Sequence, residues 1–509
     1  MGIRNLLLSL LMFSFQIAQA NVIPNSLFTE NCVLQQGVEV PVWGTASINE
    51  KVTIFFEDQV INAIANNLGK WLVKLKPLKA STVPQQLIIQ GQNKITINGI
   101  LVGEVWLCSG QSNMGFPLRA IKPVGAYSKA ATVIKDAQQY PLIRQFSIPL
   151  QKNKDIPGLK EDVNGKWLVC DSTTAPNFSA VAYFFGRELF KKLKVPIGLI
   201  NASYGGTAIE NWISRETLES FPELKSIFTD YEKALHAFPE KLNNFTIHQK
   251  ELMEKYFRDS SENAMLHKET PRKPSPPMSP AERGGPTGLW NTMISPLIPY
   301  AIKGCVWYQG EANGSRGIQY RVLLPALINS WRSSWNLGNF PFIIIQIPGW
   351  KGHQPELREA QLITAEHLSN TAMTVITDCD DTLDVHPGNK EPVGWRASRQ
   401  ALGLAYGDTS ENWGPVYQSM SVLNNQMILH FKHIGSGLIA RNGTLKDFEI
   451  AGPDKQFVPA IATIINNNII VSAPEIYNPV AVRMGWRQCP QVNLFNKEGF
   501  CATAFRTIN

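Results

Sequence analysis

Short apolar runs that alternate with helical sequence constrain the fold of this chain more than any other feature. Each run is too short for an ordinary helix, and the runs occupy residues 104–108, 195–200, 304–308, 340–346 and 373–376. Between the first two lies a segment of helical period, residues 179–194, for which Ser179 is a suitable N-cap. Strands that are apolar on both faces and alternate with helices are typical of a parallel sheet covered by helices. The sequence therefore predicts an α/β domain over residues 102–407.

Alternating apolar and polar residues on both sides of this domain predict two further domains rich in strands. Residues 38–43 and 51–56 show the pattern before the α/β domain, and residues 426–431 and 468–471 show it afterwards. We expect a sandwich-like β-domain over 21–101 and a second β-domain over 408–509. Inside the α/β domain, residues 227–286 combine charged helical sequence with a proline-rich stretch, which indicates a surface insertion.

The first twenty residues have the pattern of a cleaved export signal. Arg4 precedes an apolar run over residues 6–17, and Ala18-Gln19-Ala20 forms a small-x-small cleavage site. The alternative is an N-terminal membrane anchor, but the run is too short to span a bilayer comfortably. We expect cleavage near Ala20, a mature chain that begins at Asn21, and a secreted or periplasmic protein.

Composition and cysteine spacing exclude several classes of partner. The 48 Lys and Arg exceed the 41 Asp and Glu by seven charges spread along the chain, so no basic block predicts nucleic-acid binding. After residue 17 the sequence has no run of 18 apolar residues, so it predicts no membrane span. Seven cysteines leave at least one thiol free, and Cys489 with Cys501 is the closest pair in sequence among the candidates for a disulfide. Neither Cys-x-x-Cys nor His-Glu-x-x-His occurs, so we expect no zinc site.

Three loops that follow predicted strands hold the residue types that acyl transfer needs. Ser112 lies in a glycine-containing turn after the first run, although Met114 shows that this is not a Gly-x-Ser-x-Gly elbow. Gly205 and Gly206 follow the second run, where backbone N–H groups can approach a ligand closely. Asn313 follows the third run and carries an amide suited to an oxyanion. Each residue alone is equally typical of a turn.

A general base is the remaining requirement, and His386 is the best candidate among eight histidines. It follows the last apolar run and has Asp384 two residues before it, and a base beside an acid activates a serine. His353 is a second candidate from position alone. A single loop histidine is otherwise an ordinary surface residue.

Four motifs in this order resemble a known family. They read GEVWLCSGQSNM (103–114), GGTAIENW (205–212), VWYQGEAN (306–313) and HPGNKEPVG (386–394). The order Ser, Gly, Asn, His is similar to that of the SGNH hydrolase superfamily, and the motifs more closely resemble the sialate O-acetylesterase family. The resemblance covers nearly the whole mature chain. It implies a three-layer parallel-sheet hydrolase domain of SGNH type, flanked by N-terminal and C-terminal β-domains.

The resemblance also implies roles for individual residues and no cofactor. Ser112 would be the nucleophile and His386 the base, while the Ser112 and Gly205 N–H groups and the Asn313 amide would hold the oxyanion. The superfamily usually places its acid three residues before the histidine, which here is Leu383. We therefore expect Asp384, one residue closer, to serve, with Asp380, Asp381 or a Ser–His dyad as alternatives.

The substrate implied is an O-acetylated sialic acid, and four further residues are expected to contact it: Gln111, Gln309, Glu311 and Arg358. Arg358 or Arg396 could bind the carboxylate of the sugar, or either could form a salt bridge within the protein. The reaction type leaves other acetylated glycans, such as xylan, as alternative substrates. A non-catalytic carbohydrate-binding protein is the alternative of another class, and a nucleophile–base distance beyond about 4 Å would favour it.

Overall fold

The computed structural model describes residues 21–123, 128–150, 156–268, 270–271, 273–382 and 384–507. The expected export signal at residues 1–20 lies outside these residues. The core of the molecule is a sheet whose path runs β10-β9-β11-β8-β12-β13-β14. These strands are β8 (Lys94–Gly110), β9 (Ile143–Ser147), β10 (Trp167–Val169), β11 (Ile197–Ser203), β12 (Gly304–Tyr308), β13 (Phe342–Ile345) and β14 (Thr371–Thr374). All neighbours on this path are parallel except β10 and β9.

The apolar runs are buried because helices lie on both faces of this sheet. Val105 and Leu107 of β8 share one core cluster with α6 (Gly317–Trp335) and α7 (Pro355–His367). Trp106 and Cys108, which alternate with them, share the other cluster with α3 (Ala180–Leu193) and α8 (Glu391–Tyr406). Successive side chains of a strand point to opposite faces, so the buried residues of β8 from Val105 to Cys108 face one helix layer and the other in turn. The expected α/β character is confirmed.

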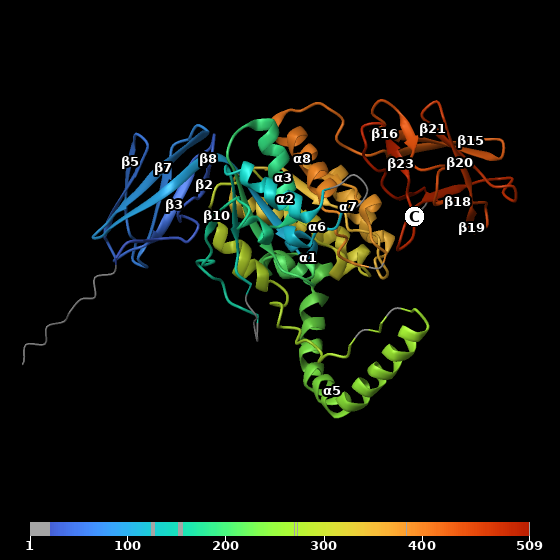
Figure 1. Cartoon of the computed structure of the whole chain (residues 1–509), viewed down its shortest axis with the longest axis horizontal. Helices are drawn as coiled ribbons and strands as arrows, with labels where there is room; N and C mark the ends of the chain where they lie inside the picture. The colour runs from blue at the N-terminus through green and yellow to red at the C-terminus, as the bar shows by residue number, and fades with distance from the viewer. Residues whose placement is uncertain are drawn as a thin grey trace, which may run out of the picture.

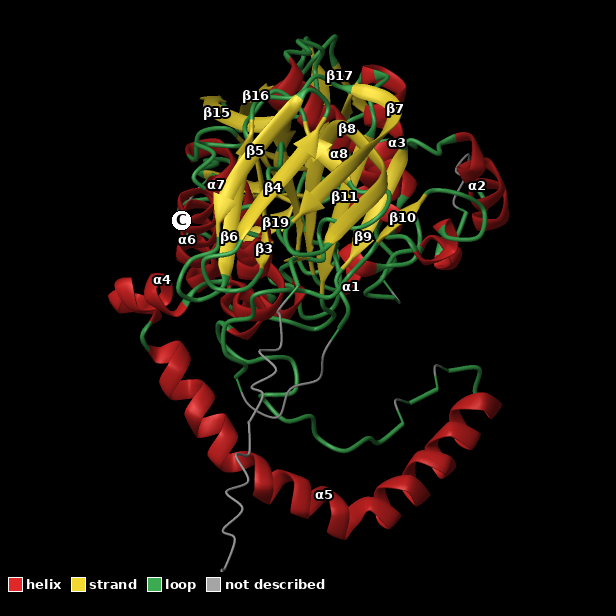
Figure 2. Ribbon diagram, turned by 90° about the vertical axis from the view of Figure 1, so that its left-hand side faces the viewer, coloured by secondary structure: helices red, strands yellow, loops and turns green. Residues whose placement is uncertain are grey.

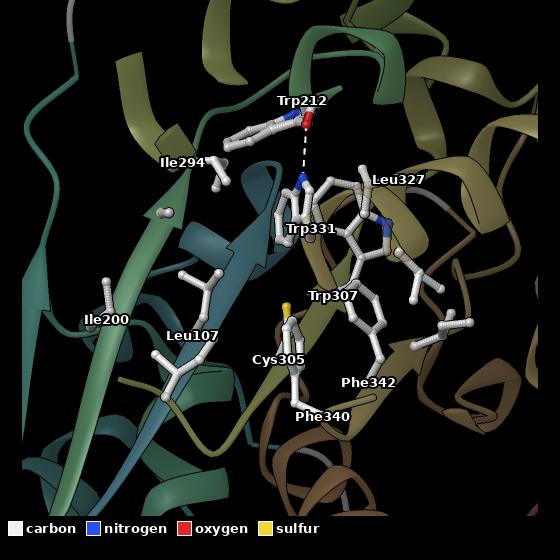
Figure 3. Close-up of a cluster of buried hydrophobic side chains, with 14 of the residues drawn as sticks. Leu107, Ile200, Trp212, Ile294, Cys305, Trp307, Leu327, Trp331, Phe340 and Phe342 are labelled. Atoms are coloured by element: carbon white, nitrogen blue, oxygen red, sulfur yellow. Dashed lines mark hydrogen bonds between the residues drawn. The ribbon is translucent and has the colours of Figure 1, made fainter. Parts of the chain in front are cut away.

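Aromatic side chains dominate the face under α6 and α7 (Figure 3). Trp307 of β12 meets Trp212 and Trp331 edge to face, with ring centroids 5.8 and 5.6 Å apart. The indole N–H of Trp331 donates to the carbonyl oxygen of Trp212 at 3.0 Å. Each edge-to-face pair adds about 1 kcal/mol to the burial of the rings. This packing fixes the segment that leads out of the loop after β11.

Strands before the central sheet form a region at one end of the molecule (Figure 1) whose pairings are antiparallel except that of β2 with β8. They are β1 (Ile23–Pro24), β2 (Val33–Gln35), β3 (Val40–Thr45), β4 (Lys51–Phe56), β5 (Gln59–Ile64), β6 (Lys70–Leu75) and β7 (Ser81–Gln90). The boundary expected between residues 101 and 102 falls within β8, a single strand of 17 residues. Its first part pairs with β7 and β2, and its second part pairs with β11 and β12.

The chain ends in a second group of strands, at the opposite end of the molecule in Figure 1. They are β15 (Val416–Leu423), β16 (Gln426–Lys432), β17 (Leu438–Ala440), β18 (Phe448–Ala451), β19 (Phe457–Pro459), β20 (Ile461–Ile465), β21 (Asn468–Ser472), β22 (Ala481–Met484), β23 (Leu494–Asn496) and β24 (Phe505–Arg506). Their sheet pairings are all antiparallel. Strand-forming sequence after residue 408 therefore occurs where the alternating pattern predicts it.

The segment expected as an insertion contains α5 (Ser226–Met265), a helix of 40 residues that projects away from the body (Figures 1 and 2). Ile227 is its one buried hydrophobic residue, and Pro239 lies inside the bent helix. The remaining helices are α1 (Ser112–Gly115), α2 (Ala130–Asp136) and α4 (Arg215–Ser220). No helix among the described residues is long and apolar enough to cross a membrane.

All seven cysteines lie in the described part of the chain, and all are free thiols. The expected disulfide between Cys489 and Cys501 is therefore wrong. Cys501 is buried with its sulfur 3.4 Å from the hydroxyl of Thr377, while Cys489 is only half-buried and lies close to Asp380 and Arg358. The two cysteines lie on either side of β23, which pairs with β17, and Cys501 forms a β-bridge with Phe495 of that strand.

Candidate active site

The nucleophile candidate sits at the carboxyl end of the central strand. Ser112 is the first residue of α1, directly after β8, and its side chain is half-buried. Gly110 has a φ of +140°, and a Cβ there would lie 2.1 Å from the carbonyl oxygen of Tyr308, so only glycine fits. The amide of Gln111 donates to the same oxygen at 3.1 Å. These contacts turn the chain sharply and direct Ser112 towards the loops of the neighbouring strands.

The base candidate reaches this serine from the loop between β14 and α8. His386 Nε2 lies 2.8 Å from Ser112 Oγ, within hydrogen-bond distance. The alternative of a non-catalytic binding protein predicted a separation beyond about 4 Å, which the structure does not have. Among the described residues, no group of three or more His, Cys, Asp or Glu side chains is placed to hold a metal ion.

The carboxylate of Asp384 lies behind the imidazole. Its Oδ1 is 3.6 Å from His386 Nδ1 and accepts the backbone N–H of His386 at 2.9 Å. Burial alone would raise the pKa of Asp384, but the His386 amide and the Lys122 ammonium group at 3.4 Å lower it below its usual value. The group is therefore an anion at neutral pH.

Two other acid candidates lie in different surroundings. Asp380 is enclosed beside Arg358, and its Oδ2 accepts the backbone N–H of Gly349 at 2.6 Å. Asp381 offers its backbone carbonyl oxygen to the amide of Asp384. Leu383, where the superfamily spacing would put the acid, lies outside the described residues. Asp384 is the candidate carboxylate that contacts His386 through both the imidazole and the backbone N–H.

The electrostatic surroundings of His386 favour a neutral imidazole. Partial burial lowers its pKa below the ordinary value of 6.5, and the nearby Lys390 acts in the same direction. The attraction of Asp384 opposes both effects. A neutral imidazole can accept a proton, so this ring is prepared to act as a general base near neutral pH.

The two other loops bring their expected residues to the same edge of the sheet. Gly205, after β11, lies so close to Ser112 that a Cβ on it would be 3.3 Å from the Ser112 Cβ. Asn313, in the 3-10 helix after β12, is fully buried and donates from Nδ2 to Glu210 at 3.0 Å. Its Oδ1 accepts from Gln309 and from the amide of Ile209 at 2.8 and 2.9 Å. These bonds fix the orientation of the amide.

A buried polar cluster that the sequence analysis missed supports the catalytic pair from behind. Asn113, next to Ser112, donates from Nδ2 to Glu311 at 2.6 Å and to the carbonyl oxygen of Val385 at 3.0 Å. The Lys390 ammonium group donates to Asn113 Oδ1 at 2.5 Å. Because Val385 precedes His386, Asn113 ties the loop of the nucleophile to the loop of the base.

Burial makes this cluster electrostatically unusual. Lys390 is fully buried, and burial lowers its pKa to about 7 against the attraction of Glu311. Enclosure of the Glu311 carboxylate raises its pKa, although Asn113 and Lys390 favour the anion. The aromatic rings of Phe116 and Tyr308 lie 5.1 and 5.2 Å from the ammonium nitrogen. The advance signal was that Asn113, Glu311 and Lys390 all lie within the sequence motifs.

Three of the residues expected to touch substrate are committed to the protein instead. Gln309 is fully buried, and its amide donates to Thr207 and Asn313 while its Oε1 accepts from Tyr320. Gln111 is buried against the amide of Ala312. One carboxylate oxygen of Glu311 accepts from Asn113, and the other is buried without a hydrogen-bond partner among the described residues. These hydrogen bonds hold the three side chains within the loops.

Neither arginine expected to bind a carboxylate is available for it. Arg358 is 1% exposed and donates to the backbone carbonyl oxygens of Arg487 and Gln488. Arg396 is 2% exposed and forms two hydrogen bonds of 2.6 Å with Asp378. Arg396 therefore forms the salt bridge that was its alternative role, and Arg358 is held by backbone acceptors, because buried guanidinium groups must find acceptors within the fold.

The chain is similar to known esterases over most of its length. No protein-family model matches the chain. The chain is 29% identical to the sialate O-acetylesterase of Rattus norvegicus over 88% of this chain and 86% of the relative. It is 25% identical to the sialate O-acetylesterase of Homo sapiens over the same shares. The crystal structure of a carbohydrate acetylesterase from Xanthomonas citri superposes with a TM-score of 0.79 at 29% identity, covering 96% of this chain and all of that one.

Proposed function

We propose that this chain is an esterase that removes O-acetyl groups from sialic acids through an acetyl-enzyme on Ser112. Its similarity to the sialate O-acetylesterases, which the motifs predicted, and to a carbohydrate acetylesterase supports the proposal. The observation that carries the proposal is the 2.8 Å contact between His386 Nε2 and Ser112 Oγ. A hydroxyl in hydrogen-bond contact with a neutral imidazole is an activated nucleophile.

The first half of the reaction transfers the acetyl group to the enzyme. His386 takes the Ser112 proton while the oxygen attacks the acetyl carbonyl carbon, and the carbonyl π electrons move to its oxygen. The N–H groups of Ser112 and Gly205 and the free hydrogen of the Asn313 amide hold that oxyanion. The oxyanion then collapses, and the bond between the acetyl carbon and the sugar oxygen breaks. His386 gives its proton to the departing sugar oxygen.

A water molecule completes the cycle by hydrolysing the acetyl-enzyme, again with His386 as the base. His386 removes a proton as the water oxygen attacks the acetyl-enzyme, and the second oxyanion collapses to acetate with the proton returned to Ser112. Asp384 stabilises the imidazolium that forms in both halves, through its negative charge and through the bond that positions the His386 backbone. No step requires a cofactor or a metal ion.

The arrangement of the chain fits an exported enzyme of SGNH type. We assign residues 102–407 to a three-layer hydrolase domain with an insertion at about 227–286, and residues 21–101 and 408–509 to flanking β-domains. The placement of helices on both faces of the parallel path supports this division. The pattern of the first twenty residues supports export with cleavage near Ala20.

Acetate release by the chain from Asn21 onward tests the proposal. The substrates are a panel of O-acetylated sialic acids, acetylated xylan and a simple aryl acetate, with the Ser112→Ala protein run alongside. We expect release from the sialic acids and a loss of at least about 10³-fold in Ser112→Ala, with an unchanged thermal unfolding midpoint. Acetate release from xylan alone would support the mechanism but would replace sialic acid with xylan as the substrate. A Ser112→Ala protein that retains most of the activity would overturn the nucleophile.

A further inference from the structure

The base of the insertion forms one wall of a cleft beside the candidate oxyanion loop. The cleft has a volume of about 540 Å³ and extends from Gly206 and Glu210 to the first turns of α5 and the segment that returns from it. Arg283, on that returning segment, and Arg316, before α6, are the arginines that line it. This cleft is therefore shared between the catalytic loops and the insertion.

Hydrogen bonds hold the returning segment against the loop after β11. The carbonyl oxygen of Arg283 accepts from Asn211 Nδ2 at 3.2 Å, and the amide of Thr287 donates to the carbonyl oxygen of Glu210 at 2.9 Å. Tyr204 donates its hydroxyl to the carbonyl oxygen of Glu282 at 3.4 Å. The wall is thus fixed to the catalytic region at several points, although most of α5 projects away from it (Figure 2).

The side chain of Arg283 lies directly over Gly206. Its guanidinium group donates to the Gly206 carbonyl oxygen at 2.9 Å, and a Cβ on Gly206 would lie 2.0 Å from that nitrogen. Gly206 also has a φ of +67°, which favours glycine. Since Gly205 touches Ser112, the guanidinium nitrogen is within about 12 Å of the Ser112 side chain, which is within the reach of one sugar and its substituents.

The two arginines differ in what neutralises them. Arg316 forms a 2.7 Å ion pair with Glu210, whose other oxygen accepts from Asn313. Asp230, the other carboxylate that lines the cleft, lies 3.5 Å from Lys233. Within the described parts of the chain, Arg283 has no ion pair with a carboxylate, and it is half-buried. It is therefore the positive charge in the cleft that remains available to a ligand.

We propose that Arg283 is the residue that recognises an anionic group on the substrate, in the cleft between the insertion and the loop after β11. The inference rests on the proposed function, for which the anion is the carboxylate of an acidic sugar. A planar guanidinium group binds a carboxylate through two parallel N–H donors, which gives direction as well as attraction. The insertion then contributes to substrate choice rather than to the acyl-transfer chemistry.

The test compares an O-acetylated sialic acid with its C1 methyl ester, which keeps the sugar and removes the charge. We measure kcat and KM for acetate release by the wild type, Arg283→Gln, Arg283→Lys and the exposed control Arg258→Gln on α5. The wild type and the control should prefer the acid about 10- to 100-fold in kcat/KM, mostly through KM. Arg283→Gln should reduce this preference to near one, and Arg283→Lys should keep part of it.

The outcomes separate this inference from the function it rests on. A wild type that treats acid and methyl ester alike, or an Arg283→Gln protein that keeps the preference, overturns the role of Arg283 while leaving the esterase assignment intact. A wild type that cleaves aryl acetate or xylan but neither form of the sialic acid overturns the proposed substrate itself. Thermal unfolding of each variant establishes that the comparison concerns folded protein.

Discussion

Replacing Lys390 with methionine should change how the stability of this protein depends on pH. The ammonium group is fully enclosed, 2.5 Å from Asn113 Oδ1 and above the rings of Phe116 and Tyr308. Burial disfavours the charged form and lowers its pKa from 10.5 to about 7, even though Glu311 attracts it. Methionine fills similar space and has no proton to lose, so it removes this titration from the folded state.

The sign and size of the effect follow from proton linkage. In the unfolded chain the lysine keeps its ordinary pKa, so the unfolded state binds more protons between about pH 7 and pH 10.5, and stability rises with pH in that window. Below pH 7 both states are protonated, and the full cost of the buried charge is present. The difference between the two pKa values corresponds to about 5 kcal/mol. About 2–3 kcal/mol of this is recovered between about pH 6 and about pH 9.

Urea unfolding of the wild type and Lys390→Met at these two pH values measures the effect. The free energy of unfolding of the variant minus that of the wild type should be about 2–3 kcal/mol higher at pH 6 than at pH 9. The matched control is Lys166→Met, at an exposed lysine, which should show no such change. Glu311→Gln should move the window to lower pH, because the glutamate favours the ammonium form.

A difference between wild type and Lys390→Met that stays constant from pH 6 to pH 9 would refute the reasoning. It would mean that the ammonium group is hydrated or that its proton is held equally in both states. The same variant also has a kinetic readout, since Asn113 loses the donor that orients it between the two catalytic loops. We expect kcat on an aryl acetate to fall while the fold is retained.

Two further predictions concern the catalytic pair. Because burial lowers the pKa of His386, kcat/KM should fall on the acid side with a midpoint below pH 6.5, and a midpoint above that value would contradict the described surroundings. Asp384→Asn should reduce kcat/KM about 10- to 100-fold, less than in enzymes with a fully buried acid, because this carboxylate is 38% exposed. It should also move the acid midpoint to lower pH, since Asp384 raises the pKa of His386. Activity within twofold of the wild type would instead favour a Ser–His dyad.

The sequence predicted the sheet well because burial on both faces leaves an unmistakable apolar run. The helix after Ser179 begins as expected, with the Ser179 hydroxyl accepting from the amide of Ala182 at 3.1 Å. The domain boundary near residue 101 was harder, since β8 continues through it. Only the burial changes there, from alternating to complete at Ile100, and a change of burial resembles the start of a new element.

The meeting of the Ser112 and His386 loops could be predicted, and the residues that support these loops could not. Ser112 and His386 belong to ordered motifs, and the parallel path brings the strand ends together. Sequence does not show where the donors of an arginine go, so Arg358 was expected at the substrate although the backbone of the last β-region holds it. Arg283 lies in the insertion, far from every motif, and only the returning chain brings it beside Gly206.

The unbroken course of β8 joins the N-terminal strands and the central sheet through one continuous strand. A truncation at residue 101 or 102 would therefore cut a strand that leads directly to Ser112. Removing the first region would leave the remaining half of β8 with a frayed beginning and without β7 and β2. A chimera that exchanges the N-terminal region should therefore replace strands such as β2 and β7, which pair with β8. It should keep the whole of β8 together with the central sheet.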